Sequence, residues 1–222
     1  MLFKEVQSLI FHEALIEWRL RYAINGILLY LISVIFTSYL SFRSQVNTLN
    51  PIIWNTLFWI IILFTAVNAV TKSFIQLNRG RLIYYYSVAN PIAIILSKIL
   101  YNTFLLLIIG FTGLMIYSLV LGNPVDDILL FSLNLVLGSI GFAAVLTMNS
   151  GIASKAVNST TLMAILSFPV ILPLLLIVIK ISRNALDGLD WTASYGQIIY
   201  LCAIDIIVIT ISTILFPYIW RS

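Results

Sequence analysis

The sequence has little charge, one cysteine and one histidine. Only 9% of its 222 residues are charged, whereas soluble domains carry about a quarter. The single cysteine, Cys202, excludes an intrachain disulfide and a metal cluster built from thiolates. The shortage of charge also leaves no room for a soluble catalytic domain of ordinary composition.

Several catalytic signatures are missing as well. The sequence has no phosphate-binding loop of the G-x-x-x-x-G-K-S/T kind, so we do not expect it to bind and hydrolyse a nucleotide in the usual way. It has no H-E-x-x-H, no G-x-S-x-G and no cluster of carboxylates on one helix that could hold a metal. We therefore predict that this chain is not an enzyme and has no catalytic, cofactor-binding or metal-binding residues.

What the sequence does contain is long apolar runs. Hydrophobic residues make up 61% of the chain and the mean hydropathy is +1.08. Six runs come near the roughly 20 residues that a helix needs to cross a bilayer core. We predict an all-α polytopic membrane protein with a single transmembrane domain over 1–222. The predicted spans are 23–42, 52–71, 99–121, 128–150, 160–179 and 197–219.

The basic residues are distributed unevenly between the loops. Six spans place both termini on one side, and nine of the 12 Lys and Arg residues then fall on that side against three on the other. Short cytoplasmic loops carry an excess of Lys and Arg, so we predict that both termini are cytoplasmic. Topology and anionic lipid headgroups explain the basic residues, and we expect no nucleic-acid partner.

The first 22 residues are amphipathic. Apolar residues fall on one face of a helix and polar residues on another, the pattern of a helix in the membrane interface. We predict an N-terminal amphipathic helix over 1–22 that bends up into the first span. His12 lies on the polar face, which favours a surface position over a ligand role. The first face carries Leu2, Phe3, Val6, Leu9 and Ile10, and the second carries Lys4, Glu5, Ser8 and His12.

The longest interruption between apolar runs is segment 72–98, KSFIQLNRGRLIYYYSVANPIAIILSK. It carries Lys72, Arg79, Arg81 and Lys98, whose charges are too costly to bury in lipid. We expect the segment to lie at the cytoplasmic membrane surface, with Pro91 stopping or restarting a helix. Composition alone leaves two interpretations open: an interfacial loop that anchors two helices, or a docking element.

A few polar residues fall inside the predicted spans. Asp205 is an ionisable group in the sixth span, so we expect it to face the bundle interior. It either hydrogen-bonds Asn or Ser groups of a neighbouring helix or has a role in transport.

Pro169 and Pro173 are expected to kink the fifth span. We expect four asparagines to join neighbouring helices: Asn68, Asn102, Asn134 and Asn149.

Four stretches carry a resemblance to a known family. They are FHEALIEWRLRYAING near the start, IIWNTLFWIIILF in the second span, KSFIQLNRGRLIYYYSVANPIAIILSKILYN in the middle and LSFPVILPLLLI in the fifth span. The order of an amphipathic helix, six spans and a basic segment after the second span resembles the permease fold of type-2 ABC exporters. More narrowly, the chain resembles the CcmB family of the cytochrome c maturation system.

The resemblance implies a permease subunit in a larger complex of the bacterial inner membrane. A separate CcmA-like ATPase would hydrolyse ATP, CcmC-like and CcmD-like membrane subunits would complete the complex, and a CcmE-like haem chaperone would be released from it. Haem would be a transported or handled ligand and ATP would act through the partner. The chain itself would bind no cofactor, and nothing in it resembles the tryptophan-rich haem-binding motif of CcmC.

The resemblance also implies that segment 72–98 contains a coupling helix in the ATPase groove, together with the N-terminal helix. Arginines and tyrosines suit a compact, anchored contact with a soluble partner. The residues implied for coupling are Lys72, Gln76, Arg79, Gly80, Arg81, Tyr84, Tyr85 and Tyr86.

Two other functions stay open on the sequence. One is a type-2 ABC permease for lipid, polysaccharide or drug. The other, from a different class, is a proton-driven secondary carrier that uses Asp205. A membrane enzyme such as a lipid transferase is disfavoured, because the chain lacks the acidic metal-binding motif that it would need.

Overall fold

The computed structural model describes residues 2–19, 22–42, 50–71, 74, 90–156 and 159–221. Six of its helices are long and apolar enough to cross a membrane, as predicted for an all-α polytopic protein. In chain order the elements are α1 (Leu2–Arg19), α2 (Tyr22–Phe42), α3 (Pro51–Val70), α6 (Pro91–Leu121), α7 (Ile128–Ala153), α8 (Ser159–Leu186), the 3₁₀ turn η2 (Trp191–Ala193) and α9 (Tyr195–Arg221).

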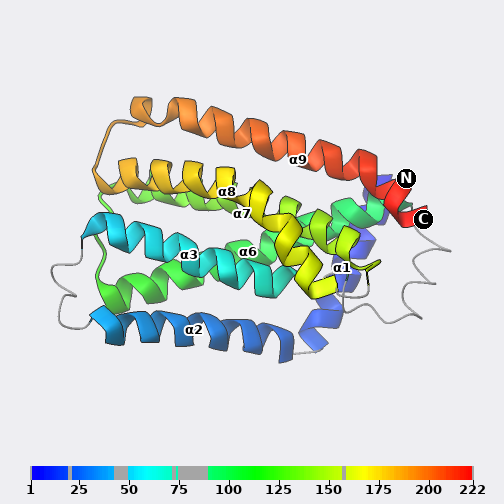
Figure 1. The fold of residues 1–222 in the computed structure, drawn as a ribbon, viewed down its shortest axis with the longest axis horizontal. Helices are drawn as coiled ribbons and strands as arrows, with labels where there is room; N and C mark the ends of the chain where they lie inside the picture. Colours follow the sequence, from blue (N-terminus) through cyan, green and yellow to red (C-terminus); the bar gives the residue numbers. More distant parts are fainter. Residues whose placement is uncertain are drawn as a thin grey trace.

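The six long helices run side by side along the long axis of the molecule, and α1 crosses one end of them (Figure 1). Helix α7 packs against α6, α8 and α9, and α1 packs chiefly against α6. The beginning of α1 and the end of α9 lie at the same end of the bundle (Figure 1). That end also holds the beginning of α6, so the flank of segment 72–98 lies beside the N-terminal helix.

Capping residues set where three of the spans begin. The side chains of Asn50 and Asn90 accept hydrogen bonds from the backbone two residues on, and a proline follows each of them. The Asp127 side chain likewise accepts hydrogen bonds from the backbone N–H groups of Leu129 and Leu130 at the start of α7, without a proline after it. An N-cap followed by proline at the first helical position is a strong helix start. The third span therefore begins at Pro91, and the predicted start at residue 99 is wrong.

The fifth span is also longer than predicted. Helix α8 continues to Leu186, so Lys180 and Arg183 lie in its last turns and not in a loop. Both side chains are exposed, and an exposed charge does not stop a helix. Pro169 and Pro173 lie inside α8, and Figure 1 shows this helix bending in its yellow half, as proline in a helix interior predicts.

Aromatic rings fill the centre of the bundle. Trp54 of α3 lies edge-on to Tyr117 of α6, with ring centroids 4.8 Å apart, and Phe58 contacts Phe131 of α7 at 5.5 Å. The Tyr117 hydroxyl donates to the Trp54 carbonyl at 3.0 Å. These side chains are at most 1% exposed, so α3, α6 and α7 share one packed aromatic core.

Asparagines join neighbouring helices, as predicted for three of the four. Asn102 of α6 donates to Thr147 Oγ1 of α7 at 2.8 Å, and Asn149 of α7 donates to Ser167 Oγ of α8 at 3.0 Å. Asn134 of α7 also donates to α8, at the Val178 carbonyl, over 2.7 Å. The prediction is wrong for Asn68, which is exposed and bonds its own helix.

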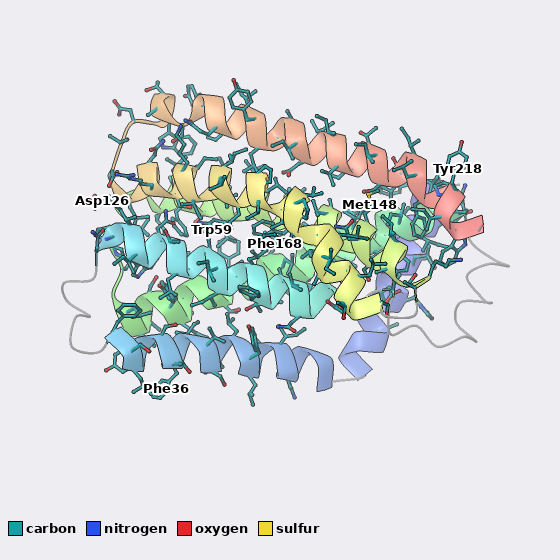
Figure 2. The ribbon with its side chains drawn as sticks, viewed as in Figure 1. Phe36, Trp59, Asp126, Met148, Phe168 and Tyr218 are labelled. Carbon is teal, nitrogen blue, oxygen red and sulfur yellow. The ribbon has the colours of Figure 1, made fainter. Side chains whose placement is uncertain are left out.

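Ser182 of α8 is the meeting point of a buried polar network. Its Oγ accepts from Trp59 Nε1 of α3 at 2.6 Å and from Asn134 Nδ2 of α7 at 2.7 Å. Its own hydroxyl donates to the Val178 carbonyl at 2.7 Å. Figure 2 shows Trp59 within the bundle, on the side of α3 that faces its neighbours. One hydroxyl thus joins three spans.

We predict that Ser182→Ala destabilises the protein, because it leaves the indole N–H of Trp59 and an amide N–H of Asn134 short of an acceptor. A buried polar group left unsatisfied costs about 1 to 3 kcal/mol. Thermal unfolding of the detergent-solubilised protein measures the effect. Ser41→Ala is the matched control, since Ser41 is exposed and its hydroxyl donates to the Thr37 carbonyl of its own helix. Equal melting temperatures for the two variants would contradict the prediction.

Candidate functional site

All eight residues implied for ATPase coupling lie outside the described residues. The structure does describe the chain on either side of them, at Phe74 and from Asn90 onwards. It also describes Lys98, the last of the four basic residues of segment 72–98. The candidate site is therefore built from the flanks of the segment and from the helices that pack against them.

Lys98 is buried, which corrects the expectation that this charge lies at the membrane surface. Its Nζ is 2.7 Å from Glu13 Oε1, and the two side chains are 3% and 14% exposed. A buried cation is tolerated when a carboxylate compensates it. Glu13 of α1 supplies that carboxylate, so the ion pair ties the N-terminal helix to α6.

Phe74 connects the same ammonium group to the opposite end of the chain. Lys98 Nζ lies 4.7 Å from the centroid of the Phe74 ring, within the range of a cation–π interaction. The Phe74 ring contacts Phe216 of α9 at 5.3 Å, and Phe216 stacks on Trp220 at 5.4 Å. The backbone N–H of Phe74 donates to Ser150 Oγ of α7 at 3.3 Å. The beginning of segment 72–98 is thus fixed to α6, α7 and α9.

Sequence reasoning missed these partners, although one signal was present. Glu13 follows Val6 and Leu9 on a single helical face, and Val6 is buried while Leu9 packs against the cluster around Phe74. An acidic residue on an apolar face indicates a buried counter-charge. The roles of Phe74, Phe216 and Trp220 had no comparable signal, because apolar residues fill most of the chain.

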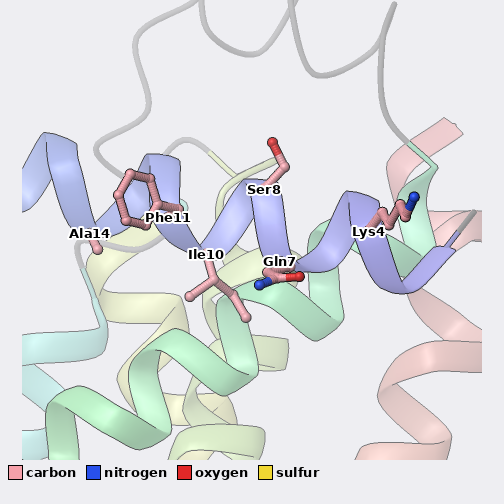
Figure 3. A pocket seen from close by; sticks show the side chains of 6 residues that line it. All are labelled: Lys4, Gln7, Ser8, Ile10, Phe11 and Ala14. Carbon is pink, nitrogen blue, oxygen red and sulfur yellow. The ribbon is translucent and has the colours of Figure 1, made fainter.

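The structure describes helix α1 over Leu2–Arg19 and α2 from Tyr22. Residues 20 and 21 lie outside the described residues, so the predicted end of the N-terminal helix at residue 22 stays a prediction. His12 is exposed, as expected. Phe3, on the apolar face predicted to meet the membrane interface, is 80% exposed. Along α1 runs a shallow groove of about 500 Å³ (Figure 3), lined by Lys4, Gln7, Ser8, Ile10, Phe11 and Ala14.

Asp205 faces the bundle interior, as predicted, and is 4% exposed. It lies against Gly141 of α7, beside Leu174 of α8. Among the described residues, neither carboxylate oxygen of Asp205 has a hydrogen-bond partner. A hydrogen bond to a neighbouring Asn or Ser, one of the two alternatives for Asp205, is therefore not found in this part of the chain. Glycine at 141 is what allows the carboxyl group to approach α7 so closely.

We predict that Gly141→Ala destabilises the protein, because the added Cβ would lie 2.5 Å from Asp205 Oδ1 and 3.2 Å from Leu174 Cδ2. Overpacking of this kind costs about 1 to 3 kcal/mol. Gly26→Ala is the matched control, since a Cβ there meets nothing within 4 Å. Melting temperatures in detergent, measured also in an Asp205→Ala background, check the cause. An equal loss in that background would show that the clash with Asp205 is not responsible.

Two aromatic side chains lie at the other end of the bundle. Trp191 is 38% exposed and Tyr195 is 53% exposed. The Trp191 indole N–H donates to Asp127 Oδ2 at 2.7 Å, so the turn before α9 is tied to the beginning of α7. In the part of the chain that the structure describes, no three His, Cys, Asp or Glu side chains lie close enough to hold a metal ion.

Six helices long and apolar enough to span a membrane, with the N-terminal helix held to α6 at one end, define a multi-pass membrane protein. The chain belongs to the CcmB protein family, which matches residues 4–221. No curated protein matches it. The CcmB family is the permease subunit of the haem-exporting ABC transporter of cytochrome c maturation. This chain is accordingly a membrane permease subunit that works with an ATPase partner and is not itself catalytic.

Proposed function

We propose that a separate, CcmA-like ATPase docks at the end of the bundle that holds α1 and segment 72–98. The coupling contact consists of Lys72, Gln76, Arg79, Gly80, Arg81, Tyr84, Tyr85 and Tyr86, with α1 beside it. ATP-driven closure of the ATPase pushes on the segment, and the six-helix bundle responds.

The observation that carries this proposal is the family match over residues 4–221. It is supported by the attachment of both flanks of the segment, since Phe74 is held by α7 and α9 while Lys98 is held by α1. A segment with fixed flanks passes a push to the bundle instead of moving independently. The chain has no phosphate-binding loop, so hydrolysis falls to the partner.

The orientation follows from charge. The end of the bundle that holds α1 carries nine of the 12 Lys and Arg residues under the predicted topology. A surplus of positive charge favours the cytoplasmic side, where a soluble ATPase is present. We place the protein in the bacterial inner membrane with both termini cytoplasmic.

Haem enters this scheme as a handled ligand and not as a resident cofactor. CcmC-like and CcmD-like subunits complete the complex within the lipid bilayer, and hydrolysis releases a CcmE-like haem chaperone in its loaded form. The chain carries one histidine, His12, which is exposed on α1. On the proposed topology that position is on the cytoplasmic side, away from a chaperone outside. We therefore assign axial ligation of haem to other subunits.

We predict that the double charge reversal Arg79→Glu and Arg81→Glu abolishes co-purification of the ATPase. Two negative charges in place of two positive charges at a docking contact strongly oppose association with a partner surface that is complementary to the arginines. The measurement is affinity purification of the tagged chain from membranes, with quantification of the ATPase that accompanies it. Wild type is expected to retain the partner.

The matched control is Lys180→Glu with Arg183→Glu, which makes the same change of charge at the opposite end of the bundle. It is expected to leave the ATPase bound. Because inner charges also set orientation, the accessibility of an engineered tag on each side verifies that both variants insert correctly. Absence of the ATPase from the wild-type preparation would refute the proposed function. Retention of the ATPase by the Arg79 and Arg81 variant would show that these two arginines do not form the docking contact.

A further inference from the structure

The Lys98 ammonium is the point where the N-terminal helix meets the beginning of segment 72–98. It bonds Glu13 of α1 at 2.7 Å and lies 4.7 Å from the centre of the Phe74 ring. Lys98 itself belongs to α6, about two turns after Pro91. One cation thus contacts two parts of the chain that the sequence separates widely, while its own helix forms the far flank of the segment.

This arrangement is demanding, because ions removed from water lose hydration that only good geometry recovers. An apolar pair at the same positions would pack at least as well in most proteins. The two side chains of the Lys98–Glu13 pair are 3% and 14% exposed. Attachment of α1 to α6 alone would not require a buried ion pair, because apolar packing could supply it. The best-attested role of a buried ionic group is to fix the register between two elements.

The surroundings make the joint rigid on the side of the bundle. Phe74 is 3% exposed and belongs to a cluster with Ile94, Ile95, Phe216 and Trp220, against which Leu9 of α1 packs. Gly151 of α7 lies so close that a Cβ there would meet the Phe216 ring at 3.1 Å. The cluster therefore has little room to adjust. Lys98 links Phe74 of segment 72–98 to Glu13 of α1 beside this cluster.

We propose that Lys98, with Glu13 and Phe74, is the joint that makes α1 and segment 72–98 move as one unit when the ATPase acts. Lys98 and Glu13 are positioning residues, since they touch neither haem nor nucleotide in this scheme. The inference rests on the proposed function. It goes further in naming the contact that converts ATPase docking into movement of the bundle.

The test uses the double variant Glu13→Leu with Lys98→Met in the intact complex. This pair removes both charges and keeps the space filled, whereas a single substitution would leave one buried charge without its present partner and risk misfolding. The matched control is Asp187→Leu with Arg183→Met, which removes the exposed ion pair at the other end of the bundle, where the charged atoms are 3.6 Å apart. Exposed pairs contribute little.

Three quantities are measured: the ATPase that co-purifies, its rate of ATP hydrolysis, and the amount of holocytochrome c formed in cells, read by haem-dependent staining. For the Glu13 and Lys98 variant we expect normal co-purification and hydrolysis within about twofold of wild type, with holocytochrome c reduced about tenfold, a loss typical of broken coupling between sites. The control is expected to match wild type in all three.

Wild-type levels of holocytochrome c in the Glu13 and Lys98 variant would overturn the inference, because coupling would then survive without the ion pair. Loss of the ATPase from this variant would overturn it as well, since the pair would then serve docking and not transmission. If wild type itself brings down no ATPase, the proposed function fails and this inference fails with it. The Arg79 and Arg81 experiment reports that outcome separately.

Discussion

The absence of water inside a bilayer is the constraint on which the rest of this structure depends. A polar group in a span is costly unless it finds a partner within the protein, because lipid offers none. Helix α7 meets this requirement for its neighbours: Asn134 and Asn149 bond α8, and Thr147 bonds Asn102 of α6. These side chains fix which helices are adjacent and at what height. The apolar contacts around them fill space but specify much less.

The same constraint explains the end of the bundle where α1 lies. A lysine two turns into a long apolar helix needs a counter-charge, and Glu13 of the N-terminal helix is close enough to supply it. The Phe74 ring lies 4.7 Å from the same ammonium and contacts Phe216 of α9. Attachment of α1 is therefore a consequence of where α6 begins. In a CcmB family permease, that attachment also holds the two flanks of the segment proposed to meet the ATPase.

Asp205 shows the opposite case within the same bundle. Its carboxylate has no hydrogen-bond partner among the described residues and packs on Gly141 instead. The sequence indicated correctly that such a residue would turn away from lipid, because exposure of a carboxylate there is costly. It gave no indication of the partner surface, since many small residues lie on the neighbouring spans. The carrier hypothesis based on Asp205 gains nothing from the family match, which assigns a permease of an ABC transporter.

Composition and periodicity determined the fold class, the number of spans and the even topology, because a bilayer core sets the length of a spanning helix and tolerates few charges. The order of amphipathic helix, six spans and basic segment also led to the family. Tertiary structure decided what the local pattern could not: that Lys98 is buried, and that Glu13 and Phe74 lie against its ammonium group. The physical reason is that a lysine is predicted to be exposed unless its counter-charge is known. For Lys98 that counter-charge is Glu13, 85 residues away along the chain.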